Sequence, residues 1–301
     1  MKQPYVPELS IMPLQPDLSD SLAIMIRAAH EAGAGIMRYF RPGQTVLASA
    51  EVRDKGFDNP LTKADLEADA LLRERLLTAH PGCGWLSEET VDHPDRLDHE
   101  RIFVVDPIDG TKEFIVGLPQ FALSLALVEQ GRPVAACIHN PATRETFTAI
   151  AGQGARLNDQ PVRTSLYREL SGASCLASRS ETAQGDWEPF LSEWRITVMG
   201  SIAYKLALVA CGRFDMTFTL SPKNEWDFCA GALLVTEAGG RVTRHSGEPF
   251  RFNRPDPMVR SVVATNGPLH DPLLVRLRHI PLAPDRYRTD ISKPRCKDIS
   301  P

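Results

Sequence analysis

The sequence predicts a mixed α and β protein with two unlike halves, helices packed on an antiparallel sheet followed by an α/β arrangement. Three observations predict this. Two helical patterns come first, short strand-like runs begin near residue 101, and strand-like and helix-like segments alternate after about residue 165. A chain of 301 residues with 43% hydrophobic content can bury one large core or two fused smaller ones. We expect an N-terminal arm (1–16), an α+β half (17–165), an α/β half (166–280) and a polar tail (281–301).

The first helix is expected between Asp17 and Phe40, where apolar residues recur at roughly helical spacing. A second helix should begin near Thr62, because an acid follows at Asp65 with capping-box spacing. Residues Leu66, Ala70, Leu76 and Leu77 supply its inner face.

The strand-like runs of the first half span residues 101–106, 121–130 and 134–140, with a turn at Gly131 and Arg132. Residues 152–161 are rich in Gly, Asn, Asp and Pro, which is typical of turns that join further short strands.

In the second half we expect strands near 173–177 and 214–220 and helices over 201–210 and 227–238. The pair Gly239 and Gly240 should end the last helix. The N-terminal arm should be extended and the tail loosely held, because the tail is polar and contains proline.

Composition excludes several classes of function. A formal charge of −4 provides no global basic field, which argues against a nucleic acid polymer as partner. No apolar run approaches the roughly 20 residues of a membrane span, and the first residues lack the pattern of a secretory signal, so we expect a cytoplasmic protein with no membrane partner.

Cysteine and histidine show no catalytic or metal-binding spacing. The six cysteines are scattered without a CxxC pattern, so we expect reduced, mostly buried thiols without a chemical role. No HExxH motif is present, and His139 is expected to be a hydrogen-bonded strand residue.

The most informative segment is 106–111, Asp-Pro-Ile-Asp-Gly-Thr, directly after an apolar strand. A sharp turn there places the carboxylates of Asp106 and Asp109 close together at the end of the strand. Without a cation between them, they would repel each other. Oxygen ligands without nearby Cys or His favour hard ions, Mg²⁺ first. Asp, Pro and Gly are also ordinary turn residues, but further acids at Glu88, Glu89 and Asp227 favour the metal site.

Two alternatives bear on this segment. Asp227 alone could be an N-cap residue, a role compatible with a place in the pocket. Phosphatases that form an aspartyl-phosphate need acids two residues apart, whereas Asp106 and Asp109 are three apart.

Four segments resemble the inositol-monophosphatase-like superfamily: LTKAD (61–65), GWLSEE (84–89), DPIDGTKEF (106–114) and EWDFCAGALLVTEAGG (225–240). With GSIAYKLALVACG (200–212) the resemblance extends from about residue 18 to 275. It implies a layered α-β-α-β-α sandwich of the inositol monophosphatase and fructose-1,6-bisphosphatase type. It also implies metal-assisted hydrolysis of a phosphomonoester without a covalent intermediate.

The resemblance further implies site residues. Two or three Mg²⁺ ions would be held by Glu88, Asp106, the Ile108 carbonyl, Asp109 and Asp227. Thr111, with Asp65 behind it, would orient and help to deprotonate the attacking water, and the amides of Gly110 and Thr111 would hold the phosphate. Paired metal ions can activate water and stabilise the leaving oxygen.

The substrate depends on the rest of the pocket. Lys112 and Lys205 resemble residues of the 3'(2'),5'-bisphosphate nucleotidase (CysQ) branch, and Lys205 could pair with a second phosphate. It could also be a solvated helix residue. Leu220 stands where an inositol-binding glutamate would be expected.

Against the nucleotidase pattern, residues 221–225 differ from the Gly-Pro-Thr-Asn that this branch often carries. The sequence therefore ranks hydrolysis of 3'-phosphoadenosine 5'-phosphate first, an inositol or other sugar-type monophosphate second, and a non-hydrolytic phosphate binder third. The partner is in each case a small phosphate ester. The oligomeric state is left open, a homodimer included.

Overall fold

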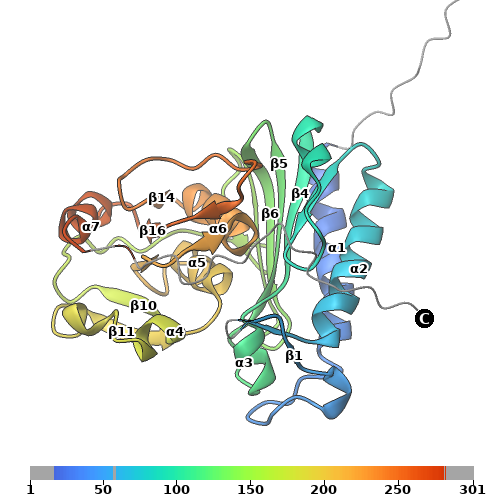
Figure 1. The fold of residues 1–301 in the computed structure, drawn as a ribbon. Coiled ribbons are helices and arrows are strands. Elements are labelled where there is room, and N and C mark those ends of the chain that lie inside the picture. The colour runs from blue at the N-terminus through green and yellow to red at the C-terminus, as the bar shows by residue number, and fades with distance from the viewer. Residues whose placement is uncertain (1–16, 57–58, 281, 283–301) are drawn as a thin grey trace, which may run out of the picture.

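The computed structural model describes residues 17–56, 59–280 and 282. The chain forms five layers (Figure 1): two helices, a seven-stranded sheet, two more helices, a five-stranded sheet and a final helical layer. The predicted α-β-α-β-α class is confirmed. The predicted arm (1–16) and nearly all of the tail (281–301) lie outside the described residues.

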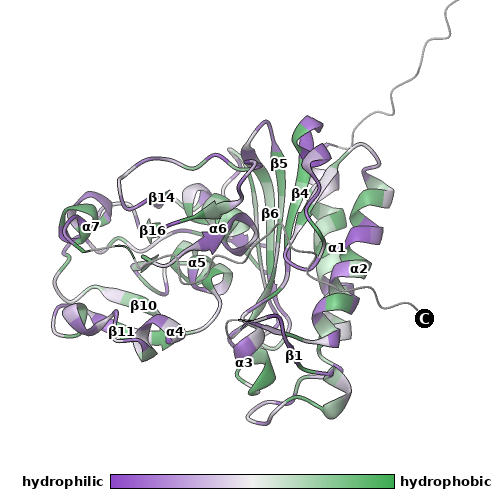
Figure 2. Cartoon of the chain, viewed as in Figure 1, coloured by the Kyte–Doolittle hydropathy of each residue, from purple (hydrophilic) through white to green (hydrophobic). Residues whose placement is uncertain are grey.

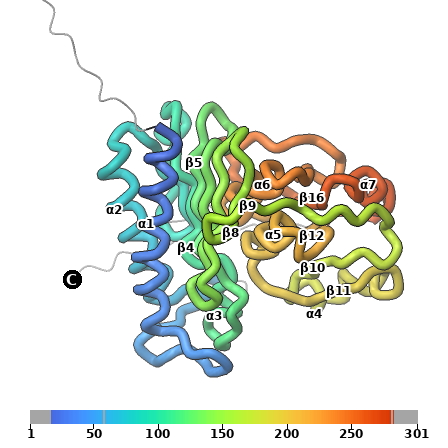
Figure 3. The backbone as a smooth tube through the Cα atoms, turned by 180° about the vertical axis from the view of Figure 1, so that it is seen from behind, coloured from blue at the N-terminus to red at the C-terminus, as the bar shows by residue number. Residues whose placement is uncertain are grey.

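The first layer consists of α1 (Leu18–Ile36) and α2 (Lys63–Ala79), which run along one face of the large sheet (Figure 3). Asp17 caps α1, and a complete capping box of Thr62 and Asp65 begins α2, as predicted. The first helix ends at Ile36, before the predicted end at Phe40, because the chain turns there while Phe40 still packs into the core.

The large sheet has the strand order β3-β4-β5-β6-β7-β8-β9. Each pair of neighbours is antiparallel except β3 and β4, which are parallel. The strands are β3 (Gly84–Ser87), β4 (Arg101–Asp109), β5 (Ala122–Glu129), β6 (Arg132–Asn140), β7 (Glu145–Ile150), β8 (Ala155–Leu157) and β9 (Gln160–Val162). Hydrophobic residues dominate its central strands (Figure 2), as expected for a sheet covered on both faces.

Two features of this sheet differ from the prediction. No strand was predicted over residues 84–87, but they form the buried strand β3, since four residues are too few for periodicity to identify a strand. Strand β4 continues to Asp109, with an irregularity in its pairing to β5 between Asp106 and Asp109. The two acids therefore lie at a bulge near the strand end.

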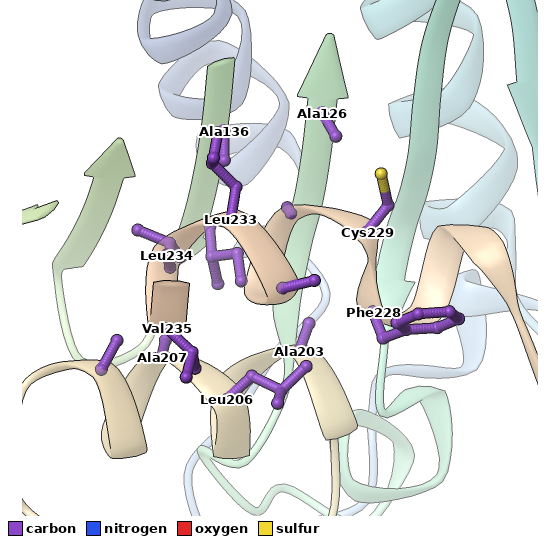
Figure 4. Close-up of a cluster of buried hydrophobic side chains, with 14 of the residues drawn as sticks. Ala126, Ala136, Ala203, Leu206, Ala207, Phe228, Cys229, Leu233, Leu234 and Val235 are labelled. Carbon is purple, nitrogen blue, oxygen red and sulfur yellow. The ribbon is translucent and has the colours of Figure 1, made fainter. Parts of the chain in front are cut away.

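The middle layer contains α5 (Ile202–Ala210) and α6 (Glu225–Glu237), which pack against each other and against the large sheet (Figure 4). Leu206 of α5 lies against α6 at Gly231, where a Cβ atom would be 2.4 Å from Leu206 Cδ1. Glycine at this position lets the helices approach closely. Helix α6 begins two residues before the predicted Asp227, because Asn224 is its N-cap.

The small sheet has the order β11-β10-β12-β16-β14. Its strands are β10 (Ser174–Ser178), β11 (Arg195–Met199), β12 (Met216–Thr219), β14 (Arg241–Thr243) and β16 (Val262–Thr265). Strands near 173–177 and 214–220 were predicted, and the other three were not. Helices α4 (Arg179–Ala183) and α7 (His270–Leu277) contact this sheet.

The remaining described elements are short. They are the pairs β1 (Arg53–Asp54) with β2 (Pro60–Leu61) and β13 (Lys223–Asn224) with β15 (Met258–Val259), and helix α3 (Thr111–Ile115). None of the helices in the described part of the chain is long and apolar enough to cross a membrane.

The cysteines are free thiols. Cys83, Cys137, Cys175 and Cys229 are buried and Cys211 is half-buried, as predicted, while Cys296 lies outside the described residues. His139 is buried on β6, with its Nδ1 atom 3.0 Å from Thr146 Oγ1, so its predicted role as a hydrogen-bonded strand residue is also confirmed.

Candidate active site

Three carboxylates converge from three elements. Glu88 directly follows β3, Asp106 lies on β4, and Asp227 lies in the first turn of α6, and each offers an oxygen atom within 4.8 Å of the other two. The parallel pairing of β3 and β4 brings the first two to the same sheet edge. Asp227, the third carboxylate, comes from the N-terminus of α6.

Two of these carboxyl groups, Asp106 and Asp227, resist ionisation. Burial raises the pKa of Asp106 well above its ordinary value, and the nearby charges of Glu88, Asp109 and Asp227 raise it further. Burial and the neighbouring Asp109 and Glu88 likewise raise the pKa of Asp227 to about 8. A divalent cation would remove this repulsion, so the residues fit a hard metal ion bound by oxygen.

Asp227 has a structural role as well. Its Oδ2 atom accepts a hydrogen bond of 2.9 Å from the amide of Asn224, which completes a capping box at the start of α6. The cap uses one carboxylate oxygen, so the two roles considered for Asp227 are geometrically compatible.

Asp109 lines the same pocket and is held from the second half of the chain. Its Oδ2 atom accepts hydrogen bonds from Ser201 Oγ at 2.5 Å and from the amide of Ala203 at 2.6 Å. Ser201 has a φ of +53°, an uncommon conformation for a residue with a side chain. Burial raises the pKa of Asp109 to about 6, although the two donors oppose this shift.

Gly110 follows with a φ of +99°, and a Cβ atom there would lie 2.7 Å from the Gln120 carbonyl oxygen. Glycine is therefore required for the turn that leads into α3. Gly110 and Thr111 both line the pocket.

The Thr111 hydroxyl lies 3.2 Å from Asp65 Oδ1 and 3.0 Å from the Ile108 carbonyl oxygen. Asp65 is fully buried, and burial raises its pKa to about 6 against the opposing hydrogen bonds from Thr62. The structure thus brings together Asp65, Ile108 and Thr111 beside the carboxylates.

Lys55 was not anticipated from the sequence. Its Nζ atom lies 2.9 Å from Glu88 Oε1 and 2.7 Å from Glu89 Oε1. Burial lowers the pKa of Lys55, but the two carboxylates outweigh burial and raise it overall. No motif marks this lysine, because the contact joins residues 33 positions apart through the β1–β2 hairpin.

These residues surround a pocket of about 290 Å³. Besides the carboxylates, its lining includes four cationic residues, Lys112, Arg179, Lys205 and Lys223. Lys205 is only 3% exposed, so the alternative of a solvated helix residue is wrong. Arg179, Ser201 and Lys223 were not singled out from the sequence, although Lys223 lies in the segment that departs from the nucleotidase pattern.

Comparisons with known proteins indicate the family to which the chain belongs. Residues 17–281 match the description "Inositol monophosphatase family". The chain is 38% identical over 234 residues to the inositol-1-monophosphatase of Rhizobium meliloti, covering 75% of this chain and 86% of the relative. It is 36% identical over 236 residues to the Nus factor SuhB of Escherichia coli, with 75% and 85% covered.

Solved structures of an inositol monophosphatase and of a SuhB protein have a similar fold. The inositol monophosphatase of Thermotoga maritima superposes with a TM-score of 0.75 at 30% identity, covering 86% of this chain and 97% of that one. The suppressor protein SuhB of Bartonella henselae gives a TM-score of 0.75 at 32% identity, with 87% and 99% covered. The order of the layers, the converging carboxylates and these similarities agree, and the chain belongs to the inositol monophosphatase family of phosphatases.

Proposed function

We propose that the protein is a Mg²⁺-dependent phosphomonoesterase that hydrolyses the phosphate ester of a small polyol or sugar. The observation that carries the proposal is the convergence of Glu88, Asp106 and Asp227, from three separate elements, within 4.8 Å in one pocket. Asp106 is buried, and carboxylates at this spacing repel one another unless a cation is bound between them.

In this proposal two or three Mg²⁺ ions are held by Glu88, Asp106, the Ile108 carbonyl, Asp109 and Asp227. When bound, Mg²⁺ supplies an acidified water and stabilises charge on the phosphate and the leaving oxygen. The chain itself orients that water through the Thr111 hydroxyl, with Asp65 as the acceptor for the proton. The amides of Gly110 and Thr111 donate to the phosphate oxygens.

The names of the relatives favour a polyol phosphate over a nucleotide, which reverses the order that the sequence suggested. The relatives cited above include inositol-1-monophosphatases, and none of those cited is named as a nucleotidase. Hydrolysis of 3'-phosphoadenosine 5'-phosphate remains the second candidate, because both lysines line the pocket.

Phosphate release from a panel of esters tests the proposal. The panel contains inositol 1-phosphate, fructose 1,6-bisphosphate, histidinol phosphate and 3'-phosphoadenosine 5'-phosphate, each with Mg²⁺ and with excess EDTA. We expect Mg²⁺-dependent release, highest for a sugar or polyol ester. Undiminished turnover in EDTA would refute the metal mechanism, and ester binding without release would indicate the non-hydrolytic binder.

A further inference from the structure

Asp69 is a buried acid that the proposed mechanism does not use. It lies on α2, one helical turn after Asp65, and is 7% exposed. Its Oδ1 atom accepts a hydrogen bond from the hydroxyl of Ser87, and its Oδ2 atom accepts one of 2.6 Å from Thr90 Oγ1. Both carboxylate oxygens are therefore engaged by hydroxyl groups of another segment.

The two hydroxyls belong to the segment that carries Glu88. Strand β3 ends at Ser87, and residues 88–90 lie outside any helix or strand. The amide of Glu88 still donates to the Val105 carbonyl, at 3.3 Å, but the regular pairing of β3 with β4 ends one residue earlier. Asp69 therefore ties the segment to α2 on both sides of Glu88.

The hydroxyl of Thr90 has a second partner. Trp85 Nε1 donates to Thr90 Oγ1 at 3.2 Å, so this hydroxyl accepts from a residue of β3 while it donates to Asp69 on α2. The side chains that hold the segment thus come from two regular elements, which fix the direction in which the chain leaves β3.

A carboxylate at this place has a cost. Burial raises the pKa of Asp69, the hydrogen bonds from Ser87 and Thr90 oppose this, and the charge of Glu88 raises it again. Like charges this close are unfavourable in the metal-free protein. A carboxylate nevertheless offers two acceptor oxygens, whereas an amide side chain offers one, and the segment presents two hydroxyl donors.

We propose that Asp69 is a positioning residue that fixes Glu88 for Mg²⁺ binding by holding the segment on both sides of it. This inference rests on the proposed function for the role of Glu88 as a metal ligand. Lys55 contacts the carboxylate of Glu88 itself, whereas Asp69 acts on the segment that carries Glu88. Removing a partner that orients a ligand in this way typically costs about ten- to hundred-fold in metal affinity.

The test compares Asp69→Ala and Asp69→Asn with Asp215→Ala. Asp215 is the matched control, because it is 5% exposed, accepts hydrogen bonds from the hydroxyls of Ser165 and Ser174, and lies outside the pocket lining. Calorimetric titration gives the Kd for Mg²⁺, and urea denaturation gives the stability. Asp69→Ala should raise the Kd about ten- to hundred-fold, while Asp215→Ala should lower stability and leave the Kd unchanged.

The conservative variant provides a rescue. Asp69→Asn should bind Mg²⁺ more tightly than Asp69→Ala, because its amide oxygen still accepts one hydroxyl. Thr90→Val keeps the shape of the side chain and removes one of the two donors, so it should also raise the Kd. If Asp69→Ala does not fold, these two variants decide the matter, and a wild-type Kd in both would overturn the proposal.

A variant without both donors tests whether Asp69 acts through the segment. Ser87→Ala combined with Thr90→Val should bind Mg²⁺ about as weakly as Asp69→Ala. Adding Asp69→Ala to this pair should change the Kd little, since residues that act as one unit are not additive. A full further loss of affinity would show that Asp69 acts independently of the segment and would overturn the proposal.

Failure of this inference and failure of the proposed function give different results. If no ester of the panel is hydrolysed but Mg²⁺ binding weakens in Asp69→Ala and not in Asp215→Ala, the proposed function fails and the positioning role stands. If hydrolysis depends on Mg²⁺ and the Asp69 variants bind Mg²⁺ as the wild type does, the positioning role fails and the proposed function stands.

Discussion

The hydroxyl of Thr111 lies 3.2 Å from Asp65 Oδ1, although the two residues are 46 positions apart. The other carboxylate oxygen of Asp65 accepts a hydrogen bond of 2.7 Å from the Thr62 amide, which caps α2. The same side chain therefore begins a helix in the outer layer and contacts Thr111, which lines the pocket. The capping box fixes the position of the carboxylate that faces Thr111.

Thr111→Ala and Asp65→Asn should each lower kcat by about two to four orders of magnitude, the usual range for a positioned proton acceptor. The control is Thr62→Ala, which breaks the cap but leaves both proposed catalytic groups. It should cost about 1 kcal/mol in the free energy of unfolding and lower kcat only a few-fold. Steady-state kinetics and urea denaturation measure the two effects. A Thr111→Ala variant with the wild-type kcat would exclude Thr111 from water activation.

Removing charge from the carboxylate cluster should stabilise the metal-free protein and abolish its response to Mg²⁺. In EDTA at pH 8, Asp106→Asn should melt at or above the wild-type temperature, because the substitution removes a buried carboxyl whose pKa burial and the neighbouring acids raise. With Mg²⁺ at 100 times its Kd, the wild type should gain about 2.7 kcal/mol and the variant much less. A variant that retains the full Mg²⁺ stabilisation would show that Asp106 is not a ligand. Thermal melts with and without Mg²⁺ provide the readout.

The same cluster sets the pH dependence of the metal-free protein. Burial and then Asp109 and Glu88 raise the pKa of Asp227 to about 8, above the value of about 4 for an unfolded aspartate. A raised pKa contributes stability that is complete below the unfolded value and is lost as the pH rises through the folded one. In EDTA the wild type should therefore lose stability between about pH 4 and 8, and Asp227→Asn should lose less. Identical pH profiles for the two proteins would contradict this account of the cluster.

Features defined by nearby residues could be predicted from the sequence. The capping box of Thr62 and Asp65 and the acids of segment 106–111 depend on neighbours within a few positions, so the sequence contains the whole signal. Two other features could not be predicted. The contact of Lys55 with Glu88 joins a hairpin to the end of a separate strand, and strand β3 is too short for its residue pattern to show a period. The burial of Lys205 follows from the packing of α5 between two sheets, which no local pattern reveals.

The cysteines should be dispensable for activity. Burial raises the pKa of Cys83 to about 11 and that of Cys137 to about 12, so few thiolates exist near neutral pH. Cys211 is the most accessible thiol in the described part of the chain, and burial raises its pKa too. Alkylation of the folded protein with iodoacetamide at pH 7.5 should leave kcat unchanged, and Cys211→Ser should behave as the wild type. Loss of activity in protein that stays folded would assign a role to a thiol.

Ser201 should set the affinity for Mg²⁺ through Asp109. Its hydroxyl donates to Asp109 Oδ2 at 2.5 Å and lowers the pKa of that carboxyl, which burial alone would raise further. Metal binding requires the deprotonated carboxylate. Ser201→Ala should therefore raise the Mg²⁺ concentration needed for half-maximal activity, by about ten-fold for a charge-assisted hydrogen bond, and shift its pH dependence to higher pH.

Ser201→Gly is the matched control for backbone strain, because glycine adopts a φ of +53° without cost. If the hydroxyl matters, both variants should need more Mg²⁺, and the glycine variant should be the more stable of the two. The amide of Ala203 still donates to Asp109 in both variants, so some affinity should remain. Mg²⁺ titrations of activity at several pH values, together with calorimetric Mg²⁺ binding, distinguish these effects. If Ser201→Gly binds Mg²⁺ as the wild type does, the serine serves the shape of the loop and not the carboxylate.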